Sequence, residues 1–310
     1  MNRTEQKIGS LTNYINQLKA LEKKSGQLLY FRGHSNKVIH PTPSIYRNDG
    51  WIANEAQMFN ELVLRCPNDF LHGLSTFQSL VKMQHYGLPT RLLDITSNPL
   101  VALYFACTTH EEDDEDGEVI VFGFDIEDQR VPDGKKGIKY FDSDTVSVIS
   151  NLSRRPATFT PPKISDIDEF NKAEEIKLLL HDVRRDKPHF ESKIVPLDLC
   201  RVLCVKPMLD NPRIIRQEGS FLLFGIDETK KQPAKIDPSN VVGRLTINKN
   251  NKKELADHLQ TLGISNATLF PEIEKVSKHI KDAYFVPSVN LATLKDATRK
   301  VFLLLRSGPA

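Results

Sequence analysis

The chain has 310 residues, of which 39% are hydrophobic and 26% are charged, and its formal net charge is +2. These proportions are typical of a globular protein that buries a core, and the near-neutral charge neither requires nor excludes a nucleic-acid partner. No apolar run reaches the roughly 18 residues that a membrane-spanning helix needs, and the first residues lack the apolar core of a signal peptide. We therefore expect a cytoplasmic protein with no membrane partner.

The four cysteines do not form a metal-binding pattern. The closest pair lies in the stretch "CRVLC", with no second pair and no nearby histidine. We expect no metal site, and we expect buried free thiols at all four positions, which are Cys66, Cys107, Cys200 and Cys204.

The first half of the chain predicts alternating helices and strands. Leucines and isoleucines at helical spacing predict an amphipathic helix over residues 4–24, stopped by Gly26. An apolar β-prone run predicts a strand over residues 27–33, and a proline-containing loop follows. Further helices are expected over residues 51–66 and 74–87.

A second group of elements is expected around Asn98. Residues 90–96 predict a short strand or an extended turn, and the next helix has Asn98 as its N-cap and Pro99 at its first position. The acidic run 110–118 is expected to be a solvated loop, followed by an alternating strand over residues 117–125.

The rest of the chain predicts one α+β domain with helical decoration. A helix is expected around residues 173–184, strands over 202–207 and 219–225, and two helices within 251–284. We expect an N-terminal helix in residues 1–27, a core in residues 28–245, and a helical extension of the same domain in residues 246–310.

Arg32 and Gly33 form the first candidate for ligand binding. An arginine at the end of an apolar strand can hold a phosphate through its planar fork, and the glycine lets a ligand approach the backbone. The structural alternative is a salt-bridged arginine at a strand end.

The second candidate is the group His85, Arg91 and Asp94. A turn at Gly87 and Pro89 can fold His85 toward the other two side chains, and an ionised Asp94 can orient Arg91 or His85. A buried polar network that fixes the loop explains the same residues equally well.

The third candidate is the pair Gln217 and Glu218, just before a glycine and an apolar strand. A carboxylate or amide at a strand end can bind a ribose hydroxyl or stabilise an oxocarbenium-like transition state. Strand alternation allows only one of the two to face a cleft. An exposed acid–amide pair is the structural alternative.

Familiar phosphate, dinucleotide, zinc-protease and esterase signatures are missing. The sequence contains no GxxxxGK[ST], GxGxxG, HExxH or GxSxG pattern. These absences argue against P-loop NTPases, Rossmann dehydrogenases, zinc proteases of that type and α/β-hydrolases.

The quoted motifs resemble a known family. The stretches that carry the resemblance are "LYFRGHSNKVIHPTPSIYR", "QHYGLPTRLLDITSNPLVALYFA", "RIIRQEGSFLLFG" and "LGISNATLFPEI". Together they are similar to the FRG-domain family, named after the Phe-Arg-Gly at Phe31–Gly33, over about residues 28–280. The family name by itself implies no activity.

The order of the motifs also resembles, more distantly, ADP-ribosyltransferases of the arginine-serine-glutamate type. That resemblance implies a split β-sheet core with surrounding helices. It implies that Arg32 holds the phosphate and the nicotinamide ribose of NAD, and that Thr96 and Ser97 support Arg32 and the wall of the site. Glu218 or Gln217 would contact the ribose, although "RQE" replaces the Glu-x-Glu of that pattern.

The expected site has catalytic and cofactor-binding members. The catalytic candidates are Glu218, Gln217, Thr96 and His85, and the cofactor-binding candidates are Arg32, Gly33, Arg91, Asp94 and Ser97.

Three functions follow as alternatives. The first is an NAD-dependent ADP-ribosyltransferase that modifies RNA, DNA or a protein, as a toxin or antiviral effector with a neutralising antitoxin partner. The second is a metal-independent nuclease built on His85, Arg91 and Asp94. The third is a non-catalytic module that binds a nucleotide or a partner.

Overall fold

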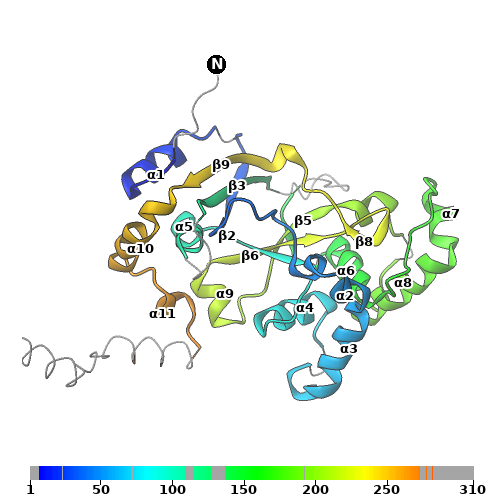
Figure 1. The fold of residues 1–310 in the computed structure, drawn as a ribbon. Helices are drawn as coiled ribbons and strands as arrows, with labels where there is room; N and C mark the ends of the chain where they lie inside the picture. The colour runs from blue at the N-terminus through cyan, green and yellow to red at the C-terminus, as the bar shows by residue number, and fades with distance from the viewer. Residues whose placement is uncertain are drawn as a thin grey trace, which may run out of the picture.

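The computed structural model describes residues 7–272 except 23, 71–72, 109–114, 127–136 and 192, together with residues 277 and 281. Within this part the chain forms a mixed seven-stranded sheet in the order β4-β5-β6-β2-β1-β3-β9, with helices packed around it (Figure 1). Neighbouring strands are antiparallel except β4 and β5, which are parallel. The α+β class is therefore confirmed.

The strands carry the apolar runs that the sequence indicates. Apart from the sheet, β7 and β8 form a small hairpin. The strands are β1 (Gln27–His34), β2 (Leu92–Thr96), β3 (Gly117–Asp125), β4 (Lys139–Tyr140), β5 (Val202–Lys206), β6 (Gly219–Phe224), β7 (Ile226–Asp227), β8 (Thr229–Pro233) and β9 (Val241–Ile247).

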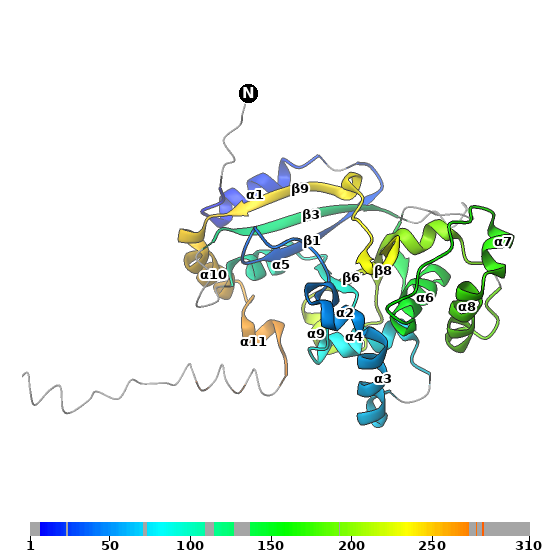
Figure 2. The same cartoon turned by 45° about the vertical axis from the view of Figure 1, so that its right-hand side comes forward.

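The helices lie at both ends of the sheet and against its faces. In both views α1, α10 and α11 lie at one end, and α6, α7 and α8 lie at the other (Figures 1 and 2). The helices are α1 (Leu11–Lys19), α2 (Asp49–Ala53), α3 (Glu55–Arg65), α4 (Thr76–His85), α5 (Pro99–Cys107), α6 (Asp144–Asn151), α7 (Ile167–Lys172), α8 (Glu174–Asp186), α9 (Pro212–Arg216), α10 (Lys252–Thr261) and α11 (Asn266–Leu269).

The sheet opens between β1 and β2. Strand β1 pairs with β3 at every residue from Gln27 to His34. With β2, which is also fully described, β1 forms one registered pair, Phe31 with Thr96. The segments that follow Phe31 and precede Thr96 therefore diverge, and the backbone leaves room for side chains at that point.

Helix α5 begins as the sequence predicts and packs very closely on β1. The Asn98 side chain accepts hydrogen bonds from the backbone N–H groups of Leu100 and Val101, and Pro99 occupies the first turn. A Cβ at Gly33 would lie only 1.7 Å from the carbonyl oxygen of Ala102. Gly33 is therefore required for helix packing, a reason different from the ligand approach that we expected.

The N-terminal segment is part of the same core as the C-terminal helices. Ile8 pairs with Ile247 of β9, and α1 starts only at Leu11 because Ser10 caps it. The expected helix over residues 4–24 is thus too long. Ile8 and Tyr14 share a hydrophobic cluster with Leu255 of α10. The domain boundaries at residues 27 and 245 stay predictions.

Two other expectations are corrected or limited. The cysteines are free, but Cys200 is exposed and Cys66 is only partly buried, contrary to the expectation that all four thiols are buried. The acidic run 110–118 lies only partly within the described residues, and the C-terminal extension beyond residue 272 lies almost wholly outside them. Among the helices of the described part, none is long and apolar enough to cross a membrane.

Candidate functional site

A cavity of about 250 Å³ lies where the sheet opens. Its walls come from β1, β2, the start of β6, and helices α4, α5 and α9. Aromatic rings form part of the wall, and the polar members bring together residues far apart in sequence. The polar lining residues are Arg32, Gln84, His85, Asp94, Thr96, Asn211, Arg213, Gln217 and Ser220.

Arg32 bridges the opening between the two strands. Its Nη1 donates a hydrogen bond to the backbone carbonyl of Asp94 at 2.7 Å. Its Nε is buried and has no hydrogen-bond partner within the described part of the chain. Burial lowers the pKa of Arg32 to about 10, partly offset by Asp94, so the side chain is charged at neutral pH. The cavity is therefore lined by a fixed cation.

Asp94 presents a carboxylate to the same cavity. Its Oδ2 accepts a hydrogen bond from Nε2 of Gln84 at 2.9 Å, and Oε1 of Gln84 accepts from the hydroxyl of Thr90. This chain of contacts fixes the orientation of the carboxylate. We expected Asp94 to orient Arg91 or His85, but its recorded side-chain partner is Gln84 from α4.

Thr96 joins the end of β2 to the segment before β6. Its hydroxyl donates to the backbone carbonyl of Gln217 at 2.6 Å and accepts from the backbone N–H of Asn98 at 3.0 Å. The Gln217 side chain lines the cavity and donates to the carbonyl of Leu269 at 3.1 Å. Thr96 is therefore a positioning residue, whereas Gln217 can contact a ligand.

Glu218 points away from the cavity. It has a φ of 46°, and its carboxylate accepts from the hydroxyl of Ser97 at 3.0 Å and from Nδ2 of Asn98 at 2.9 Å. Glu218 and Ser97 are both exposed and neither lines the cavity. The pair Gln217–Glu218 precedes β6 instead of belonging to it, so the turn geometry, not strand alternation, places Gln217 inward.

Arg91 does not belong to the cavity, contrary to our expectation that it binds the cofactor. The side chain is fully buried and donates from Nε and Nη2 to the two carboxylate oxygens of Glu55 at 2.9 and 2.5 Å. Nη1 donates to the carbonyl of Phe224 at 3.1 Å, and Nζ of Lys230 lies 3.1 Å from Glu55. Charge neutralisation by Glu55 raises the pKa of Arg91. Arg91 is part of a buried ionic cluster and does not reach the cavity.

His85 lies at the boundary between two cavities. Its Nε2 is 3.7 Å from Oε1 of Glu272, and the ring meets that of Tyr86 edge to face. Burial and the nearby charge of Arg213 lower the pKa of His85, and Glu272 opposes this. The imidazole is therefore mainly neutral at neutral pH and can accept a proton.

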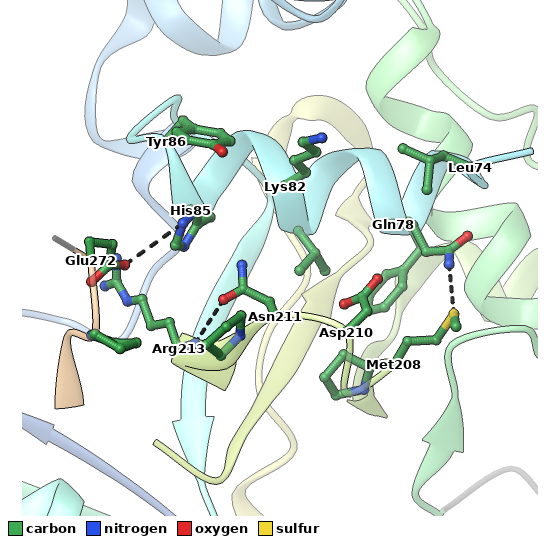
Figure 3. A pocket seen from close by; sticks show the side chains of 15 residues that line it. Leu74, Gln78, Lys82, His85, Tyr86, Met208, Asp210, Asn211, Arg213 and Glu272 are labelled. Carbon is green, nitrogen blue, oxygen red and sulfur yellow. Dashed lines mark hydrogen bonds and ion pairs between the residues drawn. The ribbon is translucent and has the colours of Figure 1, made fainter. Parts of the chain in front are cut away.

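The second cavity, of about 390 Å³, lies between α4 and the segment 207–213 (Figure 3). It shares Val81, His85, Asn211 and Arg213 with the first cavity.

Several polar residues of the two cavities were missed by sequence reasoning. In the first cavity they are Gln84, Asn211, Arg213 and Ser220, and Glu272 is among those of the second. Gln84 lies one residue before His85, so position within the motif was an available signal. Arg213 and Glu272 reach the site only through tertiary packing. No group of three or more His, Cys, Asp or Glu residues in the described ranges is arranged to hold a metal ion.

Comparison with known proteins identifies one part of the chain. Residues 27–115 match the family model of the FRG domain. No curated protein and no solved structure matches the chain. The matched region supplies Arg32, His85, Asp94 and Thr96, whereas Gln217 lies outside it.

Proposed function

The chain contains an FRG domain in residues 27–115, and on that premise we propose that the cavity at the sheet opening binds NAD and transfers ADP-ribose to a macromolecule. One observation carries the proposal. Arg32, Thr96 and Gln217 come from three motifs that are distant in sequence, yet they meet at adjacent strands in the order β6-β2-β1. This arrangement supports the distant resemblance of the motifs to ADP-ribosyltransferases with a split sheet.

The cavity has the donors that an NAD phosphate requires. Arg32 lines the cavity and is charged at neutral pH, and its planar guanidinium can bind a phosphate bidentately. A volume of about 250 Å³ is below the roughly 300–1,000 Å³ typical of ligand pockets. The cavity therefore takes the nicotinamide-ribose half and the adjoining phosphate.

Three side chains of the cavity have separate roles in the transfer. NAD, when bound, supplies the ADP-ribosyl group as its glycosidic C–N bond breaks and nicotinamide leaves with the electron pair. Asp94, held by Gln84, supplies the negative charge that favours positive charge on the ribose. Gln217 donates to a ribose hydroxyl, and neutral His85 accepts the proton lost by the acceptor. Asp94 thus takes the role first expected of Glu218.

A second function is favoured by the position of Gln217. Because an amide and not the Glu218 carboxylate faces the cavity, the site also suits a module that binds the nucleotide without turnover. The nuclease alternative loses Arg91, which is buried against Glu55. A toxin or antiviral role and an antitoxin partner stay predictions.

The decisive experiment incubates the protein with NAD labelled in its adenosine half and with separate protein, RNA and DNA pools. We expect label in one pool, with at least a tenfold loss in Arg32→Gln and Asp94→Asn. The control is Arg65→Gln, which alters an exposed arginine that pairs with Glu61 on the same helix. Binding of NAD by calorimetry without label in any pool would support the non-catalytic module. Full transfer by both site variants would reject the assignment.

A further inference from the structure

The cavity in Figure 3 opens beside the proposed NAD site. The two cavities share His85 and Arg213, so a group bound in one lies next to a group bound in the other. A transfer reaction needs such a neighbouring space for its acceptor. The chemistry of this second cavity therefore bears on what the acceptor is.

Two apolar walls face each other across the second cavity. Val81 and the almost fully buried Phe77 of α4 line one side, and Pro207, Met208 and Pro212 line the other. Apolar walls on both sides are suited to a flat ring, because the ring can stack against each of them. A cavity of about 390 Å³ has room for such a ring with its attached sugar.

The edge of the second cavity carries polar groups that can form further hydrogen bonds. The side-chain amide of Gln78 donates to the thioether sulfur of Met208 at 2.8 Å, which is a weak acceptor (Figure 3). Its Oε1 is used by the backbone N–H of Ser75. Asp210 lines the cavity and has no hydrogen-bond or ion-pair partner among the described residues. A donor and a carboxylate acceptor at one edge match a base that carries an exocyclic amino group.

The charged side chain of Arg213 lies between the two cavities. The guanidinium carbon of Arg213 lies 4.7 Å from the centroid of the Phe270 ring, and within the described residues no carboxylate pairs with Arg213. Lys82, by contrast, is paired with Asp69 at 3.0 Å. Arg213 is thus the available partner for a backbone phosphate of a bound strand.

We propose that the second cavity binds an unpaired, amino-bearing base of a single-stranded nucleic acid, which is the acceptor of the ADP-ribosyl group. Binding is a property of this cavity, whereas the role as acceptor rests on the proposed function. Glu272 is a positioning residue for His85: its Oε1 lies 3.7 Å from the imidazole, and its buried Oε2 has no partner in the described part of the chain. In the transfer, the base nitrogen bonds to the ribose carbon and its proton passes to His85.

Strand binding is measured without NAD, so that the two proposals can fail separately. Fluorescein-labelled 12-mers of cytosine and of uracil, single-stranded and as duplexes, are titrated at low salt and followed by anisotropy. We expect the single-stranded cytosine strand to bind at least fivefold more tightly than the uracil strand, and duplexes to bind more weakly still. Equal binding of all four probes, or no binding, would overturn the assignment.

Variants then assign binding to one cavity or the other. Asp210→Asn and Gln78→Leu should each weaken cytosine-strand binding at least fivefold and leave the calorimetric affinity for NAD unchanged. Arg32→Gln should weaken NAD binding and leave cytosine-strand binding unchanged. The matched control is Asp144→Asn, which lines a separate cavity beside α6 and α8. Strand binding that survives in both cavity variants rejects the site. ADP-ribose label confined to the protein pool rejects the role of the bound strand as acceptor.

The pH dependence of the transfer rate tests whether Glu272 positions His85. Glu272→Gln should shift the acidic limb of the transfer rate to lower pH, because a carboxylate that raises the pKa of His85 is removed. Arg213 and Tyr86 also lie near the imidazole and are unchanged in this variant. An unshifted pH profile would reject the positioning role. Strand binding with no transfer at any pH would reject the proposed function alone.

Discussion

Arg32 donates from Nη1 to the backbone carbonyl of Asp94 at 2.7 Å, across the place where β1 and β2 part. This bond places a charged donor over the opening and leaves the buried Nε without a partner within the described ranges. The carboxylate of Asp94 in turn accepts a hydrogen bond from Gln84. Asp94 of β2 therefore holds the Arg32 cation through its backbone carbonyl and presents its own carboxylate to the cavity.

Gln217 and Glu218 should behave differently when each is replaced by alanine. Gln217→Ala should weaken NAD binding about fivefold, which corresponds to one hydrogen bond of about 1 kcal/mol. Glu218→Ala should leave NAD binding unchanged, because its carboxylate contacts Ser97 and Asn98 outside the cavity. Calorimetric titration measures both. Loss of binding in Glu218→Ala alone would show that the carboxylate enters the site when NAD is present.

Glu55→Gln should unfold the protein more easily than any surface variant. The change removes the negative charge that pairs with Arg91 and Lys230, and leaves two buried cations without a counter-charge. Breaking such a cluster typically costs about 3–5 kcal/mol of unfolding free energy. Urea denaturation measures the loss, with Glu61→Gln in an exposed helical pair as the control. A loss as small as that of the control would contradict the ionic cluster.

The ionic cluster also predicts a pH dependence at Lys230. Burial lowers the pKa of Lys230 from 10.5 to about 8, with Glu55 opposing the shift. Between these two values the unfolded chain binds more protons at this side chain than the folded chain does. The contribution of Lys230 to the unfolding free energy must therefore rise with pH from about 8 to 10.5, and it is constant below pH 8.

The measurement compares the wild type with Lys230→Met at pH 7, 8, 9 and 10. Titration of other groups cancels in the difference between the two proteins. We expect the wild type to gain stability relative to the variant above pH 8, with a slope of at most about 1.4 kcal/mol per pH unit. A flat or falling difference would mean that Lys230 has an ordinary pKa.

Gly33→Ala should disturb the fold at the cavity. The new methyl group would lie 1.7 Å from the backbone carbonyl oxygen of Ala102, so α5 must move away from β1. We expect a loss of about 1–3 kcal/mol in unfolding free energy, as for other overpacked sites. Gly219→Ala is the matched control, because its new methyl group would lie 3.6 Å from the carbonyl oxygen of Ile214, at ordinary contact distance. Equal melting temperatures for the two variants would contradict the close packing.

Local signals predicted the elements that carry the site. Asn98 and Pro99 marked the start of α5 because capping and a fixed proline φ act within one helical turn. The apolar runs predicted β1 and the apolar part of β6 for the same reason, since strand preference depends on neighbouring side chains. Arg32 was therefore placed on the right element from the sequence. For Asp94 and Thr96 the sequence allowed a short strand or an extended turn, and the structure has the strand β2.

Long-range contacts decided what those elements do. Arg91 lies three residues from Asp94, yet its partner Glu55 is 36 residues away in sequence, and that buried pair removes Arg91 from the cavity. The positive φ of Glu218 likewise turns its carboxylate toward Ser97 and leaves Gln217 facing inward. By itself the sequence determined the motifs, the strands β1, β3, β5 and β6 and the capped helix α5, because these depend on interactions between near neighbours. Only the tertiary structure decided which charges are buried, which amide faces the ligand and which second cavity adjoins the first, because those properties depend on partners that folding brings together.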